Sequence, residues 1–181
     1  MWAKMSEKEP RRRIFFALWP DAETRRALVR ATRSVVRRSG GRATPPDNLH
    51  VTLAFLGPVT EALLERVRRV PPLLSPHFEL IFDRLGFWRG SRALWVSPRR
   101  VPQALVLLEA KLWERLVEVG FERERRPYQP HITMARKAKR VDDGVLAVRW
   151  LVSELALVES KPGSRHPVYD TLHVWPFKHV Q

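Results

Sequence analysis

One short pattern occurs twice in this chain: histidine, an apolar residue, threonine and a second apolar residue. The first copy is His50-Val51-Thr52-Leu53 and the second is His131-Ile132-Thr133-Met134, each within a run of β-forming residues. Successive side chains of a strand point to opposite faces, so each histidine shares a face with its threonine. Each copy therefore predicts a strand that buries one side and presents an imidazole beside a hydroxyl on the other.

A single His-x-Thr carries little information, because threonine is common in strands. For either copy alone, the ordinary interpretation is a half-exposed strand histidine beside a hydroxyl. Two copies in two strand-like runs instead favour a shared site. Two such strands placed side by side would direct two imidazoles and two hydroxyls into one cleft.

Apolar periodicity and turn residues divide the chain into strands and helices. Three helices are predicted: one capped by Asp21 and stopped by Gly40-Gly41, one capped by Thr60 and reaching Val70, and one from about Pro102 to Val119 with Gly120 as its stop. The predicted strands are 14–19, the first histidine strand ending at Gly57-Pro58, 78–87, 93–96, the second histidine strand, 150–160 and 168–177. In each half a long helix and a proline-bearing loop precede the His-x-Thr strand. This order predicts an α+β fold, a two-lobed pseudo-symmetric duplication with mostly antiparallel sheets lining a central cleft and helices outside.

The domain organisation expected from this pattern is simple. Residues 1–13 form a flexible basic leader, and residues 14–181 form a single two-lobed domain. The chain contains no cysteine, no secretory signal is visible at its start, and no apolar run is long enough to span a membrane. We therefore expect a monomer in the reducing cytoplasm that has no membrane contact.

The chain is strongly basic. It has 33 Lys and Arg against 19 Asp and Glu, a net charge of +14. Such an excess favours a polyanionic partner, most commonly nucleic acid, although a solvated surface or an arginine-rich composition bias explains it too.

An imidazole exchanges protons near neutral pH, so a histidine pair suits acid–base chemistry at a phosphate. No HExxH, cysteine pair, carboxylate cluster or P-loop is present, so we expect no metal and no cofactor.

The chain resembles the two-histidine (2H) phosphoesterase superfamily, and within it the bacterial RNA 2',3'-cyclic phosphodiesterase branch, also called 2'-5' RNA ligase or LigT-like. The likeness spans about Ile14 to Phe177 and rests mainly on two motif blocks, Asn48 to Gly57 and Pro127 to Arg136. Supporting residues are Phe15-Phe16-Ala17-Leu18 and the segments Val158-Glu159-Ser160 and Pro167-Val168-Tyr169. The departures are Met134, where leucine is usual, and the basic leader.

The resemblance implies metal-independent hydrolysis of RNA 2',3'-cyclic phosphate ends to a phosphomonoester, the 2'-phosphate, and leaves open reversible 2'-5' RNA ligation. By motif position His50 resembles the general acid and His131 the general base, with Thr52 and Thr133 beside them. The residues alone leave these two roles interchangeable.

Four further residues are candidates for substrate binding: Phe55, Arg136, Phe16 and Tyr128. Phe55 and Arg136 match family positions implicated in holding the base and the phosphate. Simple strand alternation places both opposite the histidines, so a bulge or the end of a strand must turn them into the cleft. Phe16 and Tyr128 are candidate cleft residues whose alternative place is the core.

Two other classes of function compete. A non-catalytic RNA or nucleotide-binding protein would use the same basic cleft but leaves the doubled motif unexplained. A zinc protein would combine His50 and His131 with His77, His166, His173 or His179, which show no ligand spacing.

Overall fold

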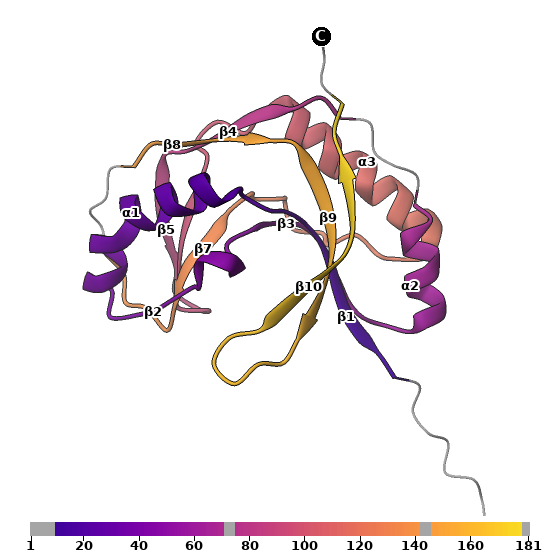
Figure 1. The fold of residues 1–181 in the computed structure, drawn as a ribbon, viewed down its shortest axis with the longest axis horizontal. Helices are drawn as coiled ribbons and strands as arrows, with labels where there is room; N and C mark the ends of the chain where they lie inside the picture. The colour runs from indigo at the N-terminus through magenta and orange to yellow at the C-terminus, as the bar shows by residue number, and fades with distance from the viewer. Residues whose placement is uncertain (1–9, 71–74, 142–145, 179–181) are drawn as a thin grey trace, which may run out of the picture.

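Two four-stranded antiparallel sheets form the two lobes of the molecule (Figure 1). Sheet A has the strand order β10-β9-β1-β3, and sheet B has the order β2-β7-β6-β5. A two-stranded sheet, β4-β8, joins the lobes at the top of Figure 1. The computed structural model describes residues 10–70, 75–141 and 146–178. Among these residues every pair of named strands is antiparallel, so the predicted α+β class with two lobes is confirmed.

The elements follow one another along the chain in this order: β1 (Arg12–Leu18), α1 (Ala22–Arg38), β2 (Arg42–Ala43), the 3-10 turn η1 (Pro46–Asn48), β3 (Val51–Val59), α2 (Glu61–Arg68), β4 (Phe78–Phe82), β5 (Arg84–Trp88), β6 (Ala93–Ser97), α3 (Gln103–Val119), β7 (Ile132–Arg136), β8 (Val148–Val152), β9 (Glu154–Lys161) and β10 (Val168–Pro176). None of the described helices combines the length and apolar character needed to cross a bilayer.

The helix ends follow the signals in the sequence. Asp21 caps α1 by accepting a hydrogen bond from the Thr24 backbone N–H at 2.8 Å, which satisfies a free donor of the first turn. Thr60 caps α2 in the same way, through Leu63. Gly120 ends α3 with φ at +104°, a left-handed conformation that glycine adopts without a Cβ clash.

Two predicted strands are each divided in the structure. The predicted strand 78–87 separates at Asp83 into β4 and β5, and the predicted strand 150–160 separates at Ser153 into β8 and β9. In both cases the first piece joins the bridging sheet and the second joins a lobe. The predictions were wrong here because alternation records which face is buried, not which sheet a strand joins. The first histidine strand also runs on to Val59, past its expected end.

The two halves of the chain are related by pseudo-twofold symmetry. Strands β9-β1-β3 of sheet A correspond to β5-β6-β7 of sheet B, and the histidine strands β3 and β7 are equivalent. The helices cross over between lobes. Helix α1 follows β1 of sheet A but packs against β7 and β8, with Val35 buried beside Leu94 and Ala135 of sheet B. Helix α3 follows β6 of sheet B but contacts β3.

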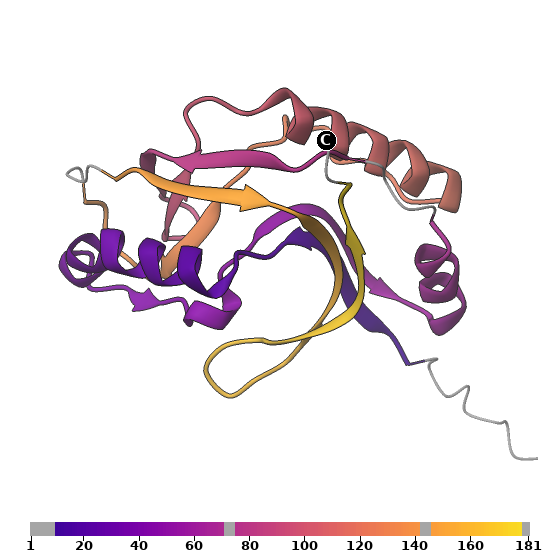
Figure 2. The same ribbon diagram turned by 45° about the horizontal axis from the view of Figure 1, so that its top comes forward.

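One large apolar core extends from Ile14 to Phe177 and includes residues of both sheets and all three α-helices. The exchange of helices therefore ties each lobe to the other half of the chain. The β9–β10 hairpin projects beyond this body, at the lower edge of the ribbon in both views (Figures 1 and 2).

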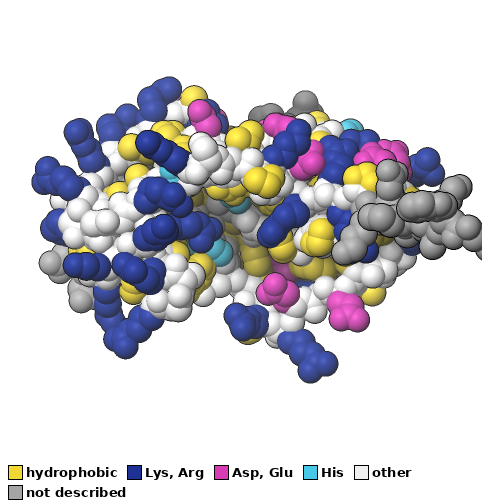
Figure 3. Space-filling view, turned by 90° about the horizontal axis from the view of Figure 1, so that it is seen from below, with side chains coloured by type: hydrophobic (Ala, Val, Ile, Leu, Met, Phe, Trp, Pro, Cys, Tyr) yellow, Lys and Arg dark blue, Asp and Glu magenta, His cyan; other side chains and the backbone are white. Residues whose placement is uncertain are grey.

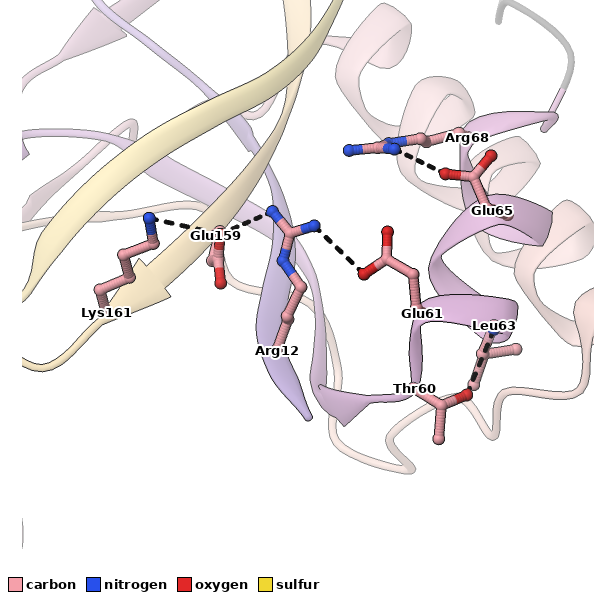
Figure 4. Close-up of polar contacts among 8 residues, drawn as sticks. All are labelled: Arg12, Thr60, Glu61, Leu63, Glu65, Arg68, Glu159 and Lys161. Atoms are coloured by element: carbon pink, nitrogen blue, oxygen red, sulfur yellow. Dashed lines mark hydrogen bonds and ion pairs between the residues drawn. The ribbon is translucent and has the colours of Figure 1, made fainter. Parts of the chain in front are cut away.

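The leader predicted over residues 1–13 is too long. Strand β1 begins at Arg12, so Arg12 and Arg13 belong to the folded part. Arg12 donates to Glu159 of β9 at 2.7 Å and to Glu61 of α2 at 3.3 Å (Figure 4). A run of three arginines indicated a solvated segment, but two carboxylates hold one of them against the sheet. Residues 1–9 of the predicted leader lie outside the described residues.

Candidate active site

The two His-x-Thr motifs meet in a cleft of about 620 Å³ between the lobes. Strand β3 contributes Thr52 and Phe55 to its lining, with His50 directly before the strand, and β7 contributes Thr133 and Arg136, with His131 directly before it. Figure 3 shows the molecule hollowed near the middle of this face, with histidine side chains beside the hollow. The structure thus brings together six of the eight predicted site residues.

A bulge in β3 turns Phe55 into the cleft. In its pairing with β1, Phe16 lies opposite Ala54 and Ala17 opposite Thr52, so Leu53 has no partner. The extra residue shifts the alternation, and Leu53 and Ala54 are therefore both buried. Phe55, which strict alternation places opposite the histidine, instead lines the cleft with 47% of its surface exposed.

Strand β7 repeats this bulge. Leu94 of β6 lies opposite Ala135 and Trp95 opposite Thr133, so Met134 is the residue without a partner. Met134 and Ala135 are both buried, and Arg136 reaches the cleft. The bulge therefore lies at the same place in both halves of the chain, at the residue that follows each motif threonine.

Each imidazole is held in one orientation by its own strand entry. The Nδ1 atom of His50 lies 2.7 Å from the carbonyl oxygen of Asn48, and that of His131 lies 2.8 Å from the carbonyl oxygen of Gln129. Because a carbonyl only accepts hydrogen bonds, Nδ1 carries the proton in both rings. Each neutral ring therefore keeps its Nε2 lone pair for chemistry, which is the tautomer a proton acceptor needs.

The surroundings of the two rings differ. His50 stacks on Trp19 with ring centroids 4.8 Å apart, and Phe15 and Tyr169 contact it at 5.1 and 5.2 Å. His131 meets one aromatic ring, Trp88, edge-on at 4.4 Å. His50 is consequently the more enclosed of the two.

This enclosure lowers the basicity of both rings. Burial is the largest cause that lowers the pKa of His50, to about 4, opposed by the hydrogen bond to Asn48 and assisted by the positive charges of His131 and Arg136. Burial, with a smaller contribution from Arg136, also lowers the pKa of His131. At neutral pH the unliganded cleft therefore holds two neutral imidazoles beside an arginine.

Two of the eight predicted site residues do not line the cleft. Phe16 points to the opposite face of β1 from Phe15 and lies in the core, 1% exposed, with its ring 5.6 Å from that of Trp175. Tyr128 packs against the same core, and burial of its hydroxyl raises its pKa. Neither lines the cleft. An aromatic ring next to apolar neighbours was core in both cases.

Several cleft residues were missed by the sequence reasoning. Phe15 lines the cleft in place of Phe16, and strand alternation alone would have indicated it. Arg13 lies with its guanidinium 5.5 Å above the Phe55 ring. Asn48 donates through its side chain to the carbonyl oxygen of Pro167 at 2.8 Å, which ties the His50 turn to the start of β10. No local signal in the sequence indicates that contact.

Among the described residues, the other histidines do not complete a metal site. His166 lines the cleft, whereas His77 and His173 do not, and His179 lies outside the described residues. Across residues 10–70, 75–141 and 146–178, no group of three or more His, Cys, Asp or Glu side chains is arranged to hold a metal ion.

The family model of the 2'-5' RNA ligase superfamily matches residues 18–163 of this chain, a range that includes both histidine strands. The chain belongs to the 2'-5' RNA ligase superfamily. Superfamily members named RNA 2',3'-cyclic phosphodiesterase are similar along most of their length. The one from Escherichia coli is 35% identical over 141 residues, covering 74% of this chain and 75% of the relative. The one from Thermus thermophilus is 32% identical over 180 residues, covering 88% and 87%.

Solved structures from the superfamily share the fold. Escherichia coli LigT in apo form superposes with a TM-score of 0.84 at 28% identity, covering 94% of this chain and all of that one. The same protein complexed with 3'-AMP gives a TM-score of 0.84 at 29% identity. The resemblance first seen in the two motif blocks is therefore confirmed over nearly the whole chain.

Proposed function

We propose that this protein is a hydrolase of RNA 2',3'-cyclic phosphate ends, which it opens to the 2'-phosphate without a metal ion. The proposal rests above all on one observation. Two imidazoles with free Nε2 atoms and two threonine hydroxyls line a single basic cleft. The relatives named RNA 2',3'-cyclic phosphodiesterase and the LigT complex with 3'-AMP support the same substrate class.

Hydrolysis of the cyclic phosphodiester requires one general base and one general acid on opposite sides of phosphorus. His131 takes a proton from the attacking water through Nε2, a P–O bond forms, and the bond from phosphorus to the 3' oxygen breaks. His50 gives its Nε2 proton to that leaving oxygen. The products are a 2'-phosphate and a 3'-hydroxyl. The hydroxyls of Thr52 and Thr133 donate to the non-bridging oxygens, and Arg136 offsets the charge that develops on them.

The low pKa of His50 fits an acid that is protonated only when substrate is bound. In the unliganded cleft burial, assisted by the positive charge of Arg136, disfavours the imidazolium form of His50. A bound phosphodiester places a negative charge between the rings and against Arg136, which favours the charged form of an imidazole. Substrate binding thus supplies the electrostatic condition that the acid requires.

The name of the superfamily points to a second reaction in the same cleft. If the 5'-hydroxyl of another RNA replaces water as the nucleophile, the same proton transfers yield a 2'-5' phosphodiester and a free 3'-hydroxyl. We propose ligation as the alternative outcome of one mechanism. We further propose that the residues from Arg12 onward form a single domain and that the protein acts as a monomer in a reducing cytoplasm, as its lack of cysteine suggests.

The test is incubation of the purified protein with a 2',3'-cyclic-phosphate oligonucleotide in the presence of EDTA. We expect a 2'-phosphate to form at the rate seen without chelator. Activity that disappears in EDTA and returns with Zn²⁺ or Mn²⁺ would refute the metal-independent reaction. A non-catalytic RNA-binding protein would bind the oligonucleotide and leave its end intact.

A further inference from the structure

We infer that the RNA strand carrying the cyclic end leaves the cleft over the lobe formed by α1 and sheet B. It follows a cationic rim made of Arg37, Arg42, Arg136, Lys137 and Lys139, all exposed. The inference rests on the proposed function, since it places the remainder of the same substrate.

The rim begins with two arginines that lie directly opposite each other. Arg42 of β2 pairs with Arg136 of β7, and both line the cleft. Like charges at opposed positions of an antiparallel pair destabilise it. Within the described part of the chain, neither guanidinium has a carboxylate partner. A phosphate between them would relieve this repulsion, because one anion can accept hydrogen bonds from both.

The local backbone holds these arginines in register. Strand β2 is only two residues long, and the Thr44 N–H donates to the carbonyl oxygen of Met134 at 2.9 Å directly after it. A Cβ at Gly41 would lie 2.8 Å from the Cβ of Ala138, so only glycine allows β2 to approach β7 this closely. The pair of arginines is therefore built into the sheet rather than placed by flexible loops.

Three segments without acidic residues converge where β7 ends. These segments are 25–46, 84–108 and 125–141, and none contains Asp or Glu. The Ala138 N–H donates to the carbonyl oxygen of Arg92 at 3.0 Å, and the Lys139 N–H donates to that of Ser39 at 2.8 Å. Arg37, Lys137 and Lys139 are thereby gathered beside the Arg42–Arg136 pair. Lys and Arg side chains crowd this half of the molecule in Figure 3.

The opposite lobe pairs several of its cations with carboxylates, whereas Arg13 lies over the Phe55 ring with no carboxylate partner among the described residues. Arg12 is paired with Glu159 and Glu61, and Lys161 with Glu159 (Figure 4). Lys161 is also paired with Asp170. The Asp and Glu side chains visible in Figure 3 lie mostly over this half. Carboxylates beside a phosphate chain would repel it, so a polyanion finds its favourable path on the side of sheet B.

Arg165 offers the competing exit. It lies in the β9–β10 hairpin, lines the cleft and has no carboxylate partner among the described residues. However, the only other lysine or arginine of this hairpin is Lys161, which is already in an ion pair with Asp170. A run of phosphates needs several cations in succession, and among the described residues the sheet B rim supplies five of them.

The experiment compares a short and a long substrate: a 2',3'-cyclic mononucleotide and a longer single-stranded RNA with the same end. The variants are Arg42→Gln and the double variant Lys137→Gln/Lys139→Gln, with Arg165→Gln as the matched change at the other exit. Arg115→Gln on α3, paired with Glu118, is the control far from the cleft. Each protein is assayed at several salt concentrations.

We expect the double variant to lower kcat/KM for the long RNA by roughly tenfold at low salt, through KM, and to lower it less for the mononucleotide. The slope of log affinity for the long RNA against log salt should become shallower by about 0.7 for each phosphate that is no longer neutralised. Arg115→Gln should match the wild type on both substrates, and Arg165→Gln should change both substrates by a similar factor.

A long RNA that loses affinity only in Arg165→Gln would show that the strand leaves by the hairpin and would overturn the inference. Equal kcat/KM for both substrates in the wild type would overturn it too. If the wild type hydrolyses neither substrate, the proposed function fails while the rim remains testable. Binding of a long RNA ending in a 2'-phosphate, measured by fluorescence anisotropy, then decides between the two exits with the same variants.

Discussion

Phe55 and Arg136 lie at equivalent positions of the two halves, each turned into the cleft by a bulge in its histidine strand. The repeated bulge makes the geometry of the two halves alike, but the residue that follows it differs. One half presents an exposed aromatic face and the other a guanidinium. The cleft is therefore symmetric in its imidazoles and hydroxyls and asymmetric around them, and we propose that the aromatic side takes a base and the guanidinium side a phosphate.

The rate should depend on pH in a bell-shaped way, because one imidazole must be protonated while the other is not. The maximum of kcat/KM lies between the two pKa values of the free protein. Both are below the ordinary 6.5, that of His50 being about 4, so this optimum should fall below pH 6.5. The optimum of kcat should lie higher, because the bound anion raises both pKa values. Rate–pH profiles at low and at saturating substrate measure both, and identical optima would contradict the substrate-induced protonation.

Removing Trp19 should raise the pKa of His50. Two effects oppose each other when Trp19→Ala opens the ring to water. Opening the site weakens the effect of burial, the largest cause of the shift, and so raises the pKa, whereas loss of a cation–π contact, worth about 2 kcal/mol in a desolvated site, lowers it. The pKa of His50 is lowered from 6.5 to about 4, which at about 1.4 kcal/mol per pKa unit exceeds that contact, so the loss of burial should dominate. NMR titration of the imidazole measures the outcome, with Trp88→Ala at His131 as the matched comparison. A lower pKa in Trp19→Ala would show that stacking controls His50.

The threonines should matter less than the histidines. Thr52→Val and Thr133→Val each keep the shape of the side chain and remove one neutral donor to the phosphate oxygens. Each should lower kcat by about tenfold, the scale of a single neutral hydrogen bond. A loss as large as that of a histidine variant would mean that the hydroxyl takes part in proton transfer. Comparing the four single variants under one set of conditions separates these possibilities.

The ion pair between Arg12 and Glu159 should stabilise the fold in a pH-dependent way. Arg12→Gln should lower the free energy of unfolding by about 1.5 kcal/mol at pH 7, because a largely buried carboxylate loses its 2.7 Å partner. The hydrogen bond from Arg12 lowers the pKa of Glu159 in the folded state. Its contribution is therefore present above the carboxyl pKa of the unfolded chain, and it disappears as the pH falls through the lower folded pKa. Urea unfolding of both proteins at pH 7 and pH 3 measures this, and an equal difference at the two pH values would contradict it.

The sequence was informative where a local rule decides the outcome. The caps at Asp21 and Gly120 follow from side-chain and backbone chemistry within one turn, and both are as predicted. The shared face of each histidine with its threonine follows from strand alternation before the bulge. The placement of both motifs on one cleft followed from counting equivalent elements in the two halves.

The features that could not be predicted depend on contacts between distant segments. The need for a bulge at Phe55 and Arg136 was foreseen, but its position at Leu53 and Met134 is set by register with β1 and β6. The packing of α1 and α3 on the opposite lobe could not be predicted from the sequence, because the apolar face of an amphipathic helix shows which side is buried and not which sheet it packs against. Phe16 was a candidate for the cleft or the core, although alternation with Phe15 allowed only one of the two to face the cleft.

Central to the proposed mechanism is that His131 and His50 form a base–acid couple. His50→Ala and His131→Ala should each lower the rate by roughly 10²–10⁴-fold, and the double variant by much less than the product of the two, because the residues act together. These losses establish the couple, but they do not assign the two roles.

A phosphodiester with an unusually good leaving group, such as p-nitrophenolate, makes that assignment, because its leaving oxygen needs no proton. Measured against the 2',3'-cyclic substrate in EDTA, it should restore most of the rate lost in His50→Ala and none of that lost in His131→Ala. Rescue of His131→Ala alone would show that the roles are reversed, and full activity of either variant on the cyclic substrate would contradict the acid–base mechanism itself.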